Sequence, residues 1–281
     1  MTAPLFWASA AALAAARVGD SLTVAGEEAH HAVAVKRLRV GESALVSDAA
    51  GRLAHTSVSR VVAGRAPELT VLVESLEDVP IRVPRLILAQ ALTKQRRDEA
   101  AVAAATGLGV DAIIPWQADR SVTRWLDGAA AKAAKGVERW QTLARAEAKV
   151  ARRAWVPEVL PAVDSPALAG RLAGAVESGA VAIVLHEQAE AGLAGALGLG
   201  GRTPADAGTK ACGPTDRDGI GGATAVYLIT GPEGGIGPDE LDALKQAGCA
   251  TARLGPEILR AGLAGPAALA VASHLLARWP L

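Results

Sequence analysis

The sequence predicts an α/β protein whose larger part is built on a parallel sheet, preceded by a small β-rich domain. Short strand-like runs separated by glycine turns fill residues 20–78, whereas apolar strand runs alternate with amphipathic helical runs from residue 85 onward. Two prolines, Pro80 and Pro84, stand between these patterns. We therefore expect two domains, at residues 1–80 and 81–281.

Composition supports a folded chain and excludes several classes of protein. Of 281 residues, 51% are hydrophobic and 21% are charged, so the chain does not have the composition of a disordered acidic or basic protein. The 29 Lys and Arg balance the 29 Asp and Glu, but unevenly: residues 1–80 carry −2, residues 81–160 carry +6 and residues 161–281 carry −4. A polyanion is expected to meet the basic middle, although solvated helix faces would give the same composition.

The first 80 residues contain strand-like segments at 21–25, 45–47, 53–62 and 69–74, and helical spacing at 27–38. The apolar stretch at 5–16 lacks a positively charged start and is interpreted as folded protein, not as a signal peptide. No run approaches the roughly 18 apolar residues of a membrane span. Cys212 and Cys249 form no metal-binding or disulfide pattern, so we expect a cytoplasmic protein without a metal site.

The second part alternates strands and helices. Strands are expected at 85–92, 112–116, 181–186, 224–230 and 251–254, and helices at 96–108, 130–153, 165–178, just before 197, 238–247 and 266–278. Such alternation predicts a parallel sheet covered by helices on both faces. Residues 198–222 are rich in Gly, Thr, Asp and Pro, which predicts a flexible insertion in which Cys212 is incidental.

The strongest motif is a glycine-rich turn after an apolar strand. The segment Gly231-Pro232-Glu233-Gly234-Gly235 follows the strand at 224–230, and Pro238 opens the next helix. Ligands of parallel sheets bind beyond the carboxyl ends of strands, and glycines let backbone approach a ligand closely. An ordinary tight turn remains an alternative, but three glycines with Pro and Glu favour a binding site.

Two further strand ends carry similar chemistry. Leu254-Gly255-Pro256 leads to Leu259-Arg260 before the last helix, and Leu185-His186-Glu187 closes the strand at 181–186. His186 alone would more often be a structural histidine. Because parallel strands end at one edge of a sheet, we expect the three turns to lie together.

These turns, together with Trp-Gln-Ala-Asp-Arg-Ser at 116–121, resemble the bacterial 16S ribosomal RNA uridine-N3 methyltransferase family of the SPOUT superfamily. His31-Ala-Val and the segment from Lys36 to Glu42 resemble its N-terminal, PUA-like RNA-binding domain. The resemblance implies S-adenosylmethionine as cofactor, a trefoil knot in the C-terminal domain, and a homodimer. It also implies 16S ribosomal RNA in the small ribosomal subunit as partner.

The resemblance also suggests roles for particular residues. Arg260 is the candidate catalytic residue, because a guanidinium can stabilise the uracil anion formed when N3 loses its proton. The cofactor-binding candidates are Leu185, Glu187, Gly231, Pro232, Glu233, Gly234, Gly235, Leu254, Gly255 and Leu259. The RNA-binding candidates in the PUA-like part are His31, Lys36, Arg37 and Arg39. The basic middle of the chain adds Arg120, Arg124, Arg152 and Arg153, for each of which a place on a solvated face is an equal alternative.

The chain departs from that family at several positions. Ala261-Gly262-Leu263 stands where hydroxyl-bearing or acidic residues are usual after Leu259-Arg260, Gly107 replaces a Glu, Val150 replaces a Gln, and Lys94-Gln95-Arg96 replaces Lys-Gly-Asp. These departures motivate a second hypothesis, a catalytically impaired RNA-binding protein of the same fold. A nicotinamide-dependent dehydrogenase is disfavoured, because its glycine fingerprint is absent.

Overall fold

The structure is a computed structural model that describes residues 3–199, 220 and 222–279. The expected insertion at 198–222, with Cys212, lies outside the described residues except at positions 198, 199, 220 and 222. The chain forms two compact units, one of residues 1–81 with 145–156 and the other of residues 82–144 with 157–281.

Unit 1 is built on a five-stranded sheet of order β1-β3-β4-β5-β2. Its strands are β1 (Leu5–Trp7), β2 (Ser21–Val24), β3 (Ser43–Ser47), β4 (Arg52–Val62) and β5 (Glu68–Asp78), and its helices are α1 (Ala10–Ala15), α2 (Gly26–His30) and a π-helix (His31–Val35). The apolar stretch at 5–16 forms β1 and α1, which the sequence did not reveal as separate elements. Phe6 and Leu13 of this stretch are fully buried in the unit's core.

A segment from later in the chain completes unit 1. Residues 145–156 include the end of α4 (Ala130–Val150), and Ala148 and Ala154 pack with residues of the sheet of this unit. The Trp155 indole covers Gly51, where an added Cβ would lie 2.4 Å from the ring, and its Nε1 donates to the Val79 carbonyl at 2.8 Å. Lys149 pairs with Glu28 at 2.7 Å. Residues 145–156 therefore belong to unit 1, although the sequence analysis assigned them to the domain of residues 81–281.

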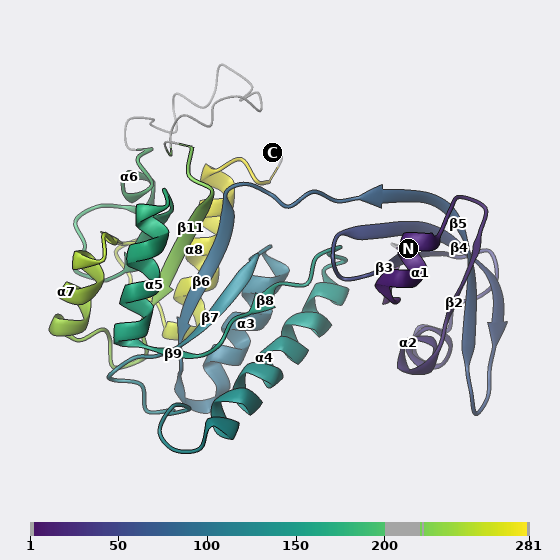
Figure 1. The fold of residues 1–281 in the computed structure, drawn as a ribbon, viewed down its shortest axis with the longest axis horizontal. Coiled ribbons are helices and arrows are strands. Elements are labelled where there is room, and N and C mark those ends of the chain that lie inside the picture. Colours follow the sequence, from purple (N-terminus) through teal and green to yellow (C-terminus); the bar gives the residue numbers. More distant parts are fainter. Residues whose placement is uncertain (1–2, 200–219, 221, 280–281) are drawn as a thin grey trace. The chain divides into compact units, whose positions relative to one another are not determined.

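Unit 2 is the parallel α/β part (Figure 1). Its sheet has the order β12-β10-β11-β6-β7-β8, every pairing is parallel, and β9 also pairs with β7. The strands are β6 (Arg85–Ala91), β7 (Ala112–Gln117), β8 (Glu158–Val159), β9 (Val163–Asp164), β10 (Val181–Leu185), β11 (Ala225–Thr230) and β12 (Ala250–Ala252). The predicted parallel sheet is confirmed, and the two short strands β8 and β9 were missed.

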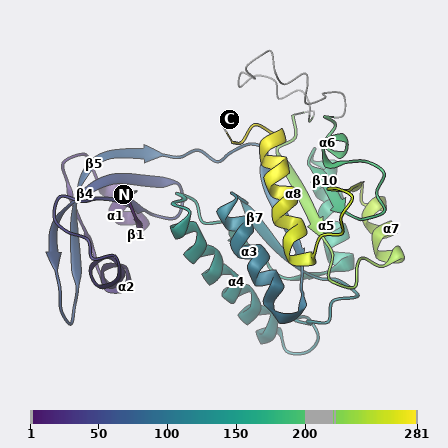
Figure 2. The same cartoon turned by 180° about the vertical axis from the view of Figure 1, so that it is seen from behind.

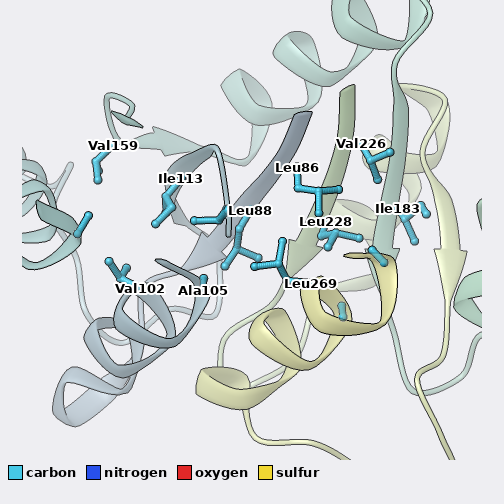
Figure 3. Close-up of a cluster of buried hydrophobic side chains, with 14 of the residues drawn as sticks. Leu86, Leu88, Val102, Ala105, Ile113, Val159, Ile183, Val226, Leu228 and Leu269 are labelled. Atoms are coloured by element: carbon cyan, nitrogen blue, oxygen red, sulfur yellow. The ribbon is translucent and has the colours of Figure 1, made fainter. Parts of the chain in front are cut away.

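Helices cover both faces of this sheet, as predicted. Helices α3 (Arg97–Gly107), α6 (Leu193–Ala196) and α8 (Ala261–Leu275) lie on one face with part of α4, and α5 (Ser165–Glu177) and α7 (Pro238–Gln246) lie on the other (Figure 2). On the first face, Leu88 and Leu228 of neighbouring strands point toward Leu269 of α8, while Val102 lies on adjacent α3 (Figure 3).

The predicted start of the last helix was wrong. The sequence analysis placed this helix at residues 266–278. In the structure α8 begins at Ala261 and contains Pro266. Gly262 and Gly265 let this early part of α8 approach α3 and β6 closely, because an added Cβ would lie 2.7 Å from the Arg97 carbonyl oxygen and 2.8 Å from Leu88 respectively. Packing against α3 and β6 thus lets the helix begin five residues earlier than the sequence pattern predicted.

Candidate functional site

One edge of the parallel sheet in unit 2 gathers most of the predicted site. Strands β12, β10, β11, β6 and β7 lie side by side and point the same way, so their carboxyl ends form one row. The loops that leave this row carry the LHE, GPEGG and LGP segments. The expected convergence of the three turns at one edge is therefore what this topology produces.

A cavity of about 290 Å³ lies at the ends of β10 and β12. Its size is near the lower end of the range of roughly 300–1,000 Å³ typical of small-molecule sites. Five predicted cofactor-binding residues line it: Leu185, Glu187, Leu254, Gly255 and Leu259. The other lining residues are His186, Ala252, Arg253, Pro256, Glu257, Ile258 and Ala264. Apolar side chains, backbone groups and a few charged groups thus share the wall.

The glycine-rich turn lies next to this cavity along the sheet edge, at the end of β11, but residues 231–235 do not line it. Glu233 instead accepts a hydrogen bond from the Lys94 backbone N–H at 3.1 Å and lies 3.6 Å from Arg97. On the other side, Arg120 donates to the Gly234 carbonyl at 3.0 Å. The turn is thereby held between the loops after β6 and β7.

The buried carboxylate of Glu240 helps to hold the end of the segment that contains the glycine-rich turn. Glu240 of α7 is only 4% exposed. It accepts hydrogen bonds from the backbone N–H of Asp119 at 2.9 Å and of Gly237 at 3.2 Å, and from the Ser165 hydroxyl. Ser165 in turn accepts from the Trp116 indole at 3.1 Å. Glu240 therefore connects the loop that carries Arg120 to the end of the glycine-rich turn.

Arg260, the predicted catalytic residue, is exposed and occupies the N-cap of α8. Its neighbours Leu259 and Ala264 line the cavity, although Arg260 does not. The first turn of α8 lies against the start of α3, where Gly262 contacts the Arg97 backbone. Arg260 is therefore presented at the rim between the cavity and the start of α3.

Six predicted RNA-binding residues belong to unit 1 and two to unit 2. Lys36, Arg37 and Arg39 are exposed and follow the π-helix; they form no ion pair with any described residue. His31 is half-buried with its ring edge-on to Phe6 at 6.3 Å, and burial together with nearby Lys149 lowers its pKa. The imidazole is therefore mostly neutral at neutral pH.

The basic middle of the sequence is divided by the fold. Arg152 and Arg153 belong to unit 1, and Arg152 is exposed with a left-handed backbone at φ 54°. Arg120 and Arg124 belong to unit 2, in the loop after β7. Arg124 pairs with Asp127 at 2.8 Å and lowers the pKa of that carboxyl. Its charge is thus partly satisfied within the chain, whereas Arg120, among the residues that the structure describes, bonds to a backbone carbonyl and to no carboxylate.

Sequence reasoning missed three side chains at this edge, those of Gln90, Arg97 and Glu240, and one backbone donor, the N–H of Lys94. Only their nearness to the strand ends could have indicated them. Among the described residues, no cluster of His, Cys, Asp or Glu could hold a metal ion. No helix in the described part of the chain is long and apolar enough to cross a membrane.

A family model described as an RNA methyltransferase domain matches residues 81–273. Among curated proteins, "Ribosomal RNA small subunit methyltransferase E" of Mycobacterium bovis is 37% identical over 93% of this chain and 89% of its own length. The protein of the same name from Bacillus subtilis is 27% identical over 90% of each chain.

Solved structures show the same fold. A ribosomal RNA small subunit methyltransferase E from Neisseria gonorrhoeae, bound to S-adenosylmethionine, superposes with a TM-score of 0.71 at 22% identity, covering 98% of both chains. A putative methyltransferase from Legionella pneumophila, in complex with the same cofactor, gives a TM-score of 0.70 at 23% identity, also covering 98% of both chains.

Proposed function

Because this chain belongs to the RNA methyltransferase family of these relatives, we propose that it uses S-adenosylmethionine to methylate N3 of a uridine in 16S ribosomal RNA. One observation carries the proposal most directly. The cavity at the ends of β10 and β12 is lined by five residues for which the family resemblance implied cofactor binding. The family model covers residues 81–273, the segment that contains this cavity.

The lining of the cavity suits this cofactor in its chemistry. Leu185, Leu254 and Leu259 offer apolar surface for an adenine ring, while the backbone around Gly255 offers donors and acceptors for its edge. Glu187 can accept hydrogen bonds from ribose hydroxyls. The bound cofactor would supply an electrophilic methyl group on a sulfonium sulfur. Gly231 to Gly235 would close the site from the β11 side.

Residues at the rim of the cavity would act on the uridine that accepts the methyl group. Uridine N3 carries a proton at neutral pH, so negative charge develops on the uracil as that proton leaves. We assign Arg260 to that charge, because its planar N–H groups match a uracil carbonyl and α8 holds its backbone at the cavity rim. Positioning and electrostatic stabilisation are the chain's main contributions.

Unit 1 is assigned to RNA binding, as a PUA-like domain. The unpaired cations Lys36, Arg37 and Arg39 would contact phosphates, and Arg152 adds a further exposed cation within the same unit. Arg120 would contact RNA from unit 2, with Arg124 and Arg153 in lesser roles. These assignments place the 16S ribosomal RNA, within the small subunit, as the partner.

A trefoil knot and a homodimer complete the proposal. Strand β12 is the edge strand of the sheet, next to β10, yet the chain after β12 returns to pack α8 on the central strands β11 and β6. Helix α6, in the connection between β10 and β11, contacts both β12 and α8. This path supports a knot. Exposed apolar side chains on and before α8, Ile258 and Leu263 among them, support a second copy of the chain as partner. We place the enzyme in the cytoplasm.

The alternative is an RNA-binding protein of the same fold with impaired catalysis. It is motivated by Ala261-Gly262-Leu263, which bring no hydroxyl to the start of α8. The structure gives Gly262 a packing role there, which favours the active enzyme.

The decisive experiment incubates the full-length protein with S-adenosylmethionine and small ribosomal subunits from a strain lacking the modification. Nucleoside mass spectrometry should detect 3-methyluridine, and the Arg260→Gln variant should lose most of the activity while still binding cofactor in calorimetry. If the wild-type protein binds cofactor and RNA but forms no 3-methyluridine, the impaired alternative is correct. Methylation at another atom would refute the N3 assignment alone.

A further inference from the structure

Two fully buried polar side chains stand at the carboxyl ends of the central strands of unit 2. Gln90 of β6 is 0% exposed and Thr230 of β11 is 1% exposed, and the two residues are directly paired in the sheet. They lie on the face that carries Leu86, Leu88, Val226 and Leu228, which is otherwise apolar and covered by α8 (Figure 3). Apolar side chains would fill this layer at lower desolvation cost.

Each polar atom of this pair is hydrogen-bonded. The Thr230 hydroxyl donates to Gln90 Oε1 at 3.0 Å and lies 3.4 Å from the Ala89 carbonyl. Gln90 Nε2 donates to the Ala91 carbonyl at 3.1 Å and lies 3.4 Å from the Ala261 carbonyl. The amide of Gln90 therefore spans from the end of β11 to the first turn of α8.

Both ends of this bridge are next to proposed site residues. Thr230 immediately precedes Gly231, where the glycine-rich turn begins, and Ala261 immediately follows Arg260. We propose that Gln90 is a positioning residue that, through Thr230 and Ala261, fixes the glycine-rich turn relative to Arg260. This inference rests on the proposed methyltransferase function and adds a residue to which no role had been given.

The packing of α8 gives the bridge its precision. An added Cβ at Gly265 would lie 2.8 Å from Leu88 and 3.2 Å from Gln90 Oε1, so α8 rests directly on this layer. The backbone N–H groups of Leu263 and Ala264 both bond to the Arg260 carbonyl, at 2.8 and 3.0 Å. A shift of the first turn of α8 would therefore move Arg260 and, through Leu259 and Ala264, the cavity wall.

The amide is better suited to this task than an apolar side chain. A leucine would fill the layer but would leave the first turn of α8 free to slide, because dispersion contacts have no preferred direction. Hydrogen bonds fix distance and angle. Misplacement of a reacting group by about 1 Å can cost about 100-fold in rate.

The test compares Gln90→Met, which keeps length and approximate volume but removes all three hydrogen bonds of the amide, with Thr230→Val and Thr230→Ser. Thr56→Val is the matched control, since Thr56 is 1% exposed, makes one hydrogen bond to the Ala44 carbonyl at 2.8 Å and lies in unit 1. Steady-state methylation gives kcat and the KM for RNA, calorimetry gives the cofactor Kd, and hydrogen exchange follows the amides of Leu263 and Ala264.

We expect Gln90→Met and Thr230→Val to lower kcat by about tenfold or more, with little change in the KM for RNA, and Thr230→Ser to restore it. Amide exchange at Leu263 and Ala264 should rise, and Thr56→Val should change neither readout. If Gln90→Met and Thr230→Val lose only as much stability as Thr56→Val and leave kcat and amide exchange unchanged, the inference is overturned. If the wild-type protein makes no methylated nucleoside, the proposed function fails, and the exchange measurement alone then decides whether Gln90 orders α8.

Discussion

The close approach of α8 to α3 at Gly262 makes a sharp prediction for Gly262→Ala. In a helix, alanine is normally better than glycine by about 1 kcal/mol. Here, however, the added Cβ would lie 2.7 Å from the Arg97 carbonyl oxygen and 3.3 Å from its carbonyl carbon. Both atoms are backbone of α3, so neither can swing aside as the end of a side chain would.

The two effects can be weighed against each other. Inserting a methyl group into a well-packed contact costs about 1–3 kcal/mol, and a backbone neighbour points to the upper half of that range. Subtracting the helix propensity gain leaves a net loss of about 1–2 kcal/mol. Gly170, exposed in the middle of α5 with nothing within 4 Å of an added Cβ, is the matched control. Gly170→Ala should increase stability by up to about 1 kcal/mol.

Denaturant unfolding of the two variants and the wild-type protein measures this difference. We expect the free energy of unfolding to fall for Gly262→Ala and to rise for Gly170→Ala, with unchanged slopes against denaturant. Methylation activity should fall with Gly262→Ala, since the first turn of α8 carries Arg260. An increase in stability for both variants would show that the helices do not meet at Gly262.

Three further predictions follow from burial and charge. Burial raises the pKa of the Cys249 thiol to about 11, so its peptide should resist alkylation near neutral pH until the protein unfolds; labelling at the rate of a free thiol would contradict this. Burial raises the pKa of Asp98 above 3.8, so the folded state holds its proton more tightly and loses stability as pH rises through that raised value. The difference in unfolding free energy between Asp98→Asn and wild type should therefore grow in favour of the variant over that range, and a difference independent of pH would refute it. Lys36→Ala and Arg37→Ala should each make the slope of log binding constant against log salt less negative by about 0.7–0.9 for RNA, and unchanged slopes would exclude phosphate contacts.

The sequence predicted unit 2 well because its strands are long apolar runs separated by amphipathic helices. Periodicity reports such elements directly. It failed where tertiary contacts define an element: β8 and β9 are two residues each, and the start of α8 depends on Gly262 and Gly265 meeting α3 and β6. The placement of residues 145–156 in unit 1 depends on Trp155 and Lys149 finding partners about 70 to 120 residues earlier in the chain, which no local pattern encodes.

The candidate site was likewise predicted only in part from the sequence. The resemblance of the strand-end turns to those of a methyltransferase family implied Leu185, Glu187, Leu254, Gly255 and Leu259, which line the cavity. The side chains that hold these turns in place could not be predicted from the sequence. Gln90 lies within an apolar strand pattern, and Glu240 has the pattern of an ordinary acid in a first helical turn. Their roles depend on burial and on partners such as Thr230 and Asp119, which only the fold brings near.

The departures from the family pattern have different weights once they are placed in the structure. Gly107 ends α3 at the edge opposite the cavity, is exposed and has open space around an added Cβ, and Val150 is 75% exposed at the end of α4. Gly107 therefore does not lie at the sheet edge that holds the cavity, and Val150 belongs to unit 1, not to the unit that contains the cavity. Of the four departures, Lys94-Gln95-Arg96 and Ala261-Gly262-Leu263 lie at that edge, next to the close approach of Gly262 to Arg97 at the starts of α8 and α3. Replacing Gly262 by a hydroxyl-bearing residue would push a Cβ into the Arg97 carbonyl, so restoring the usual residues at 261–263 should lower activity unless α3 changes as well.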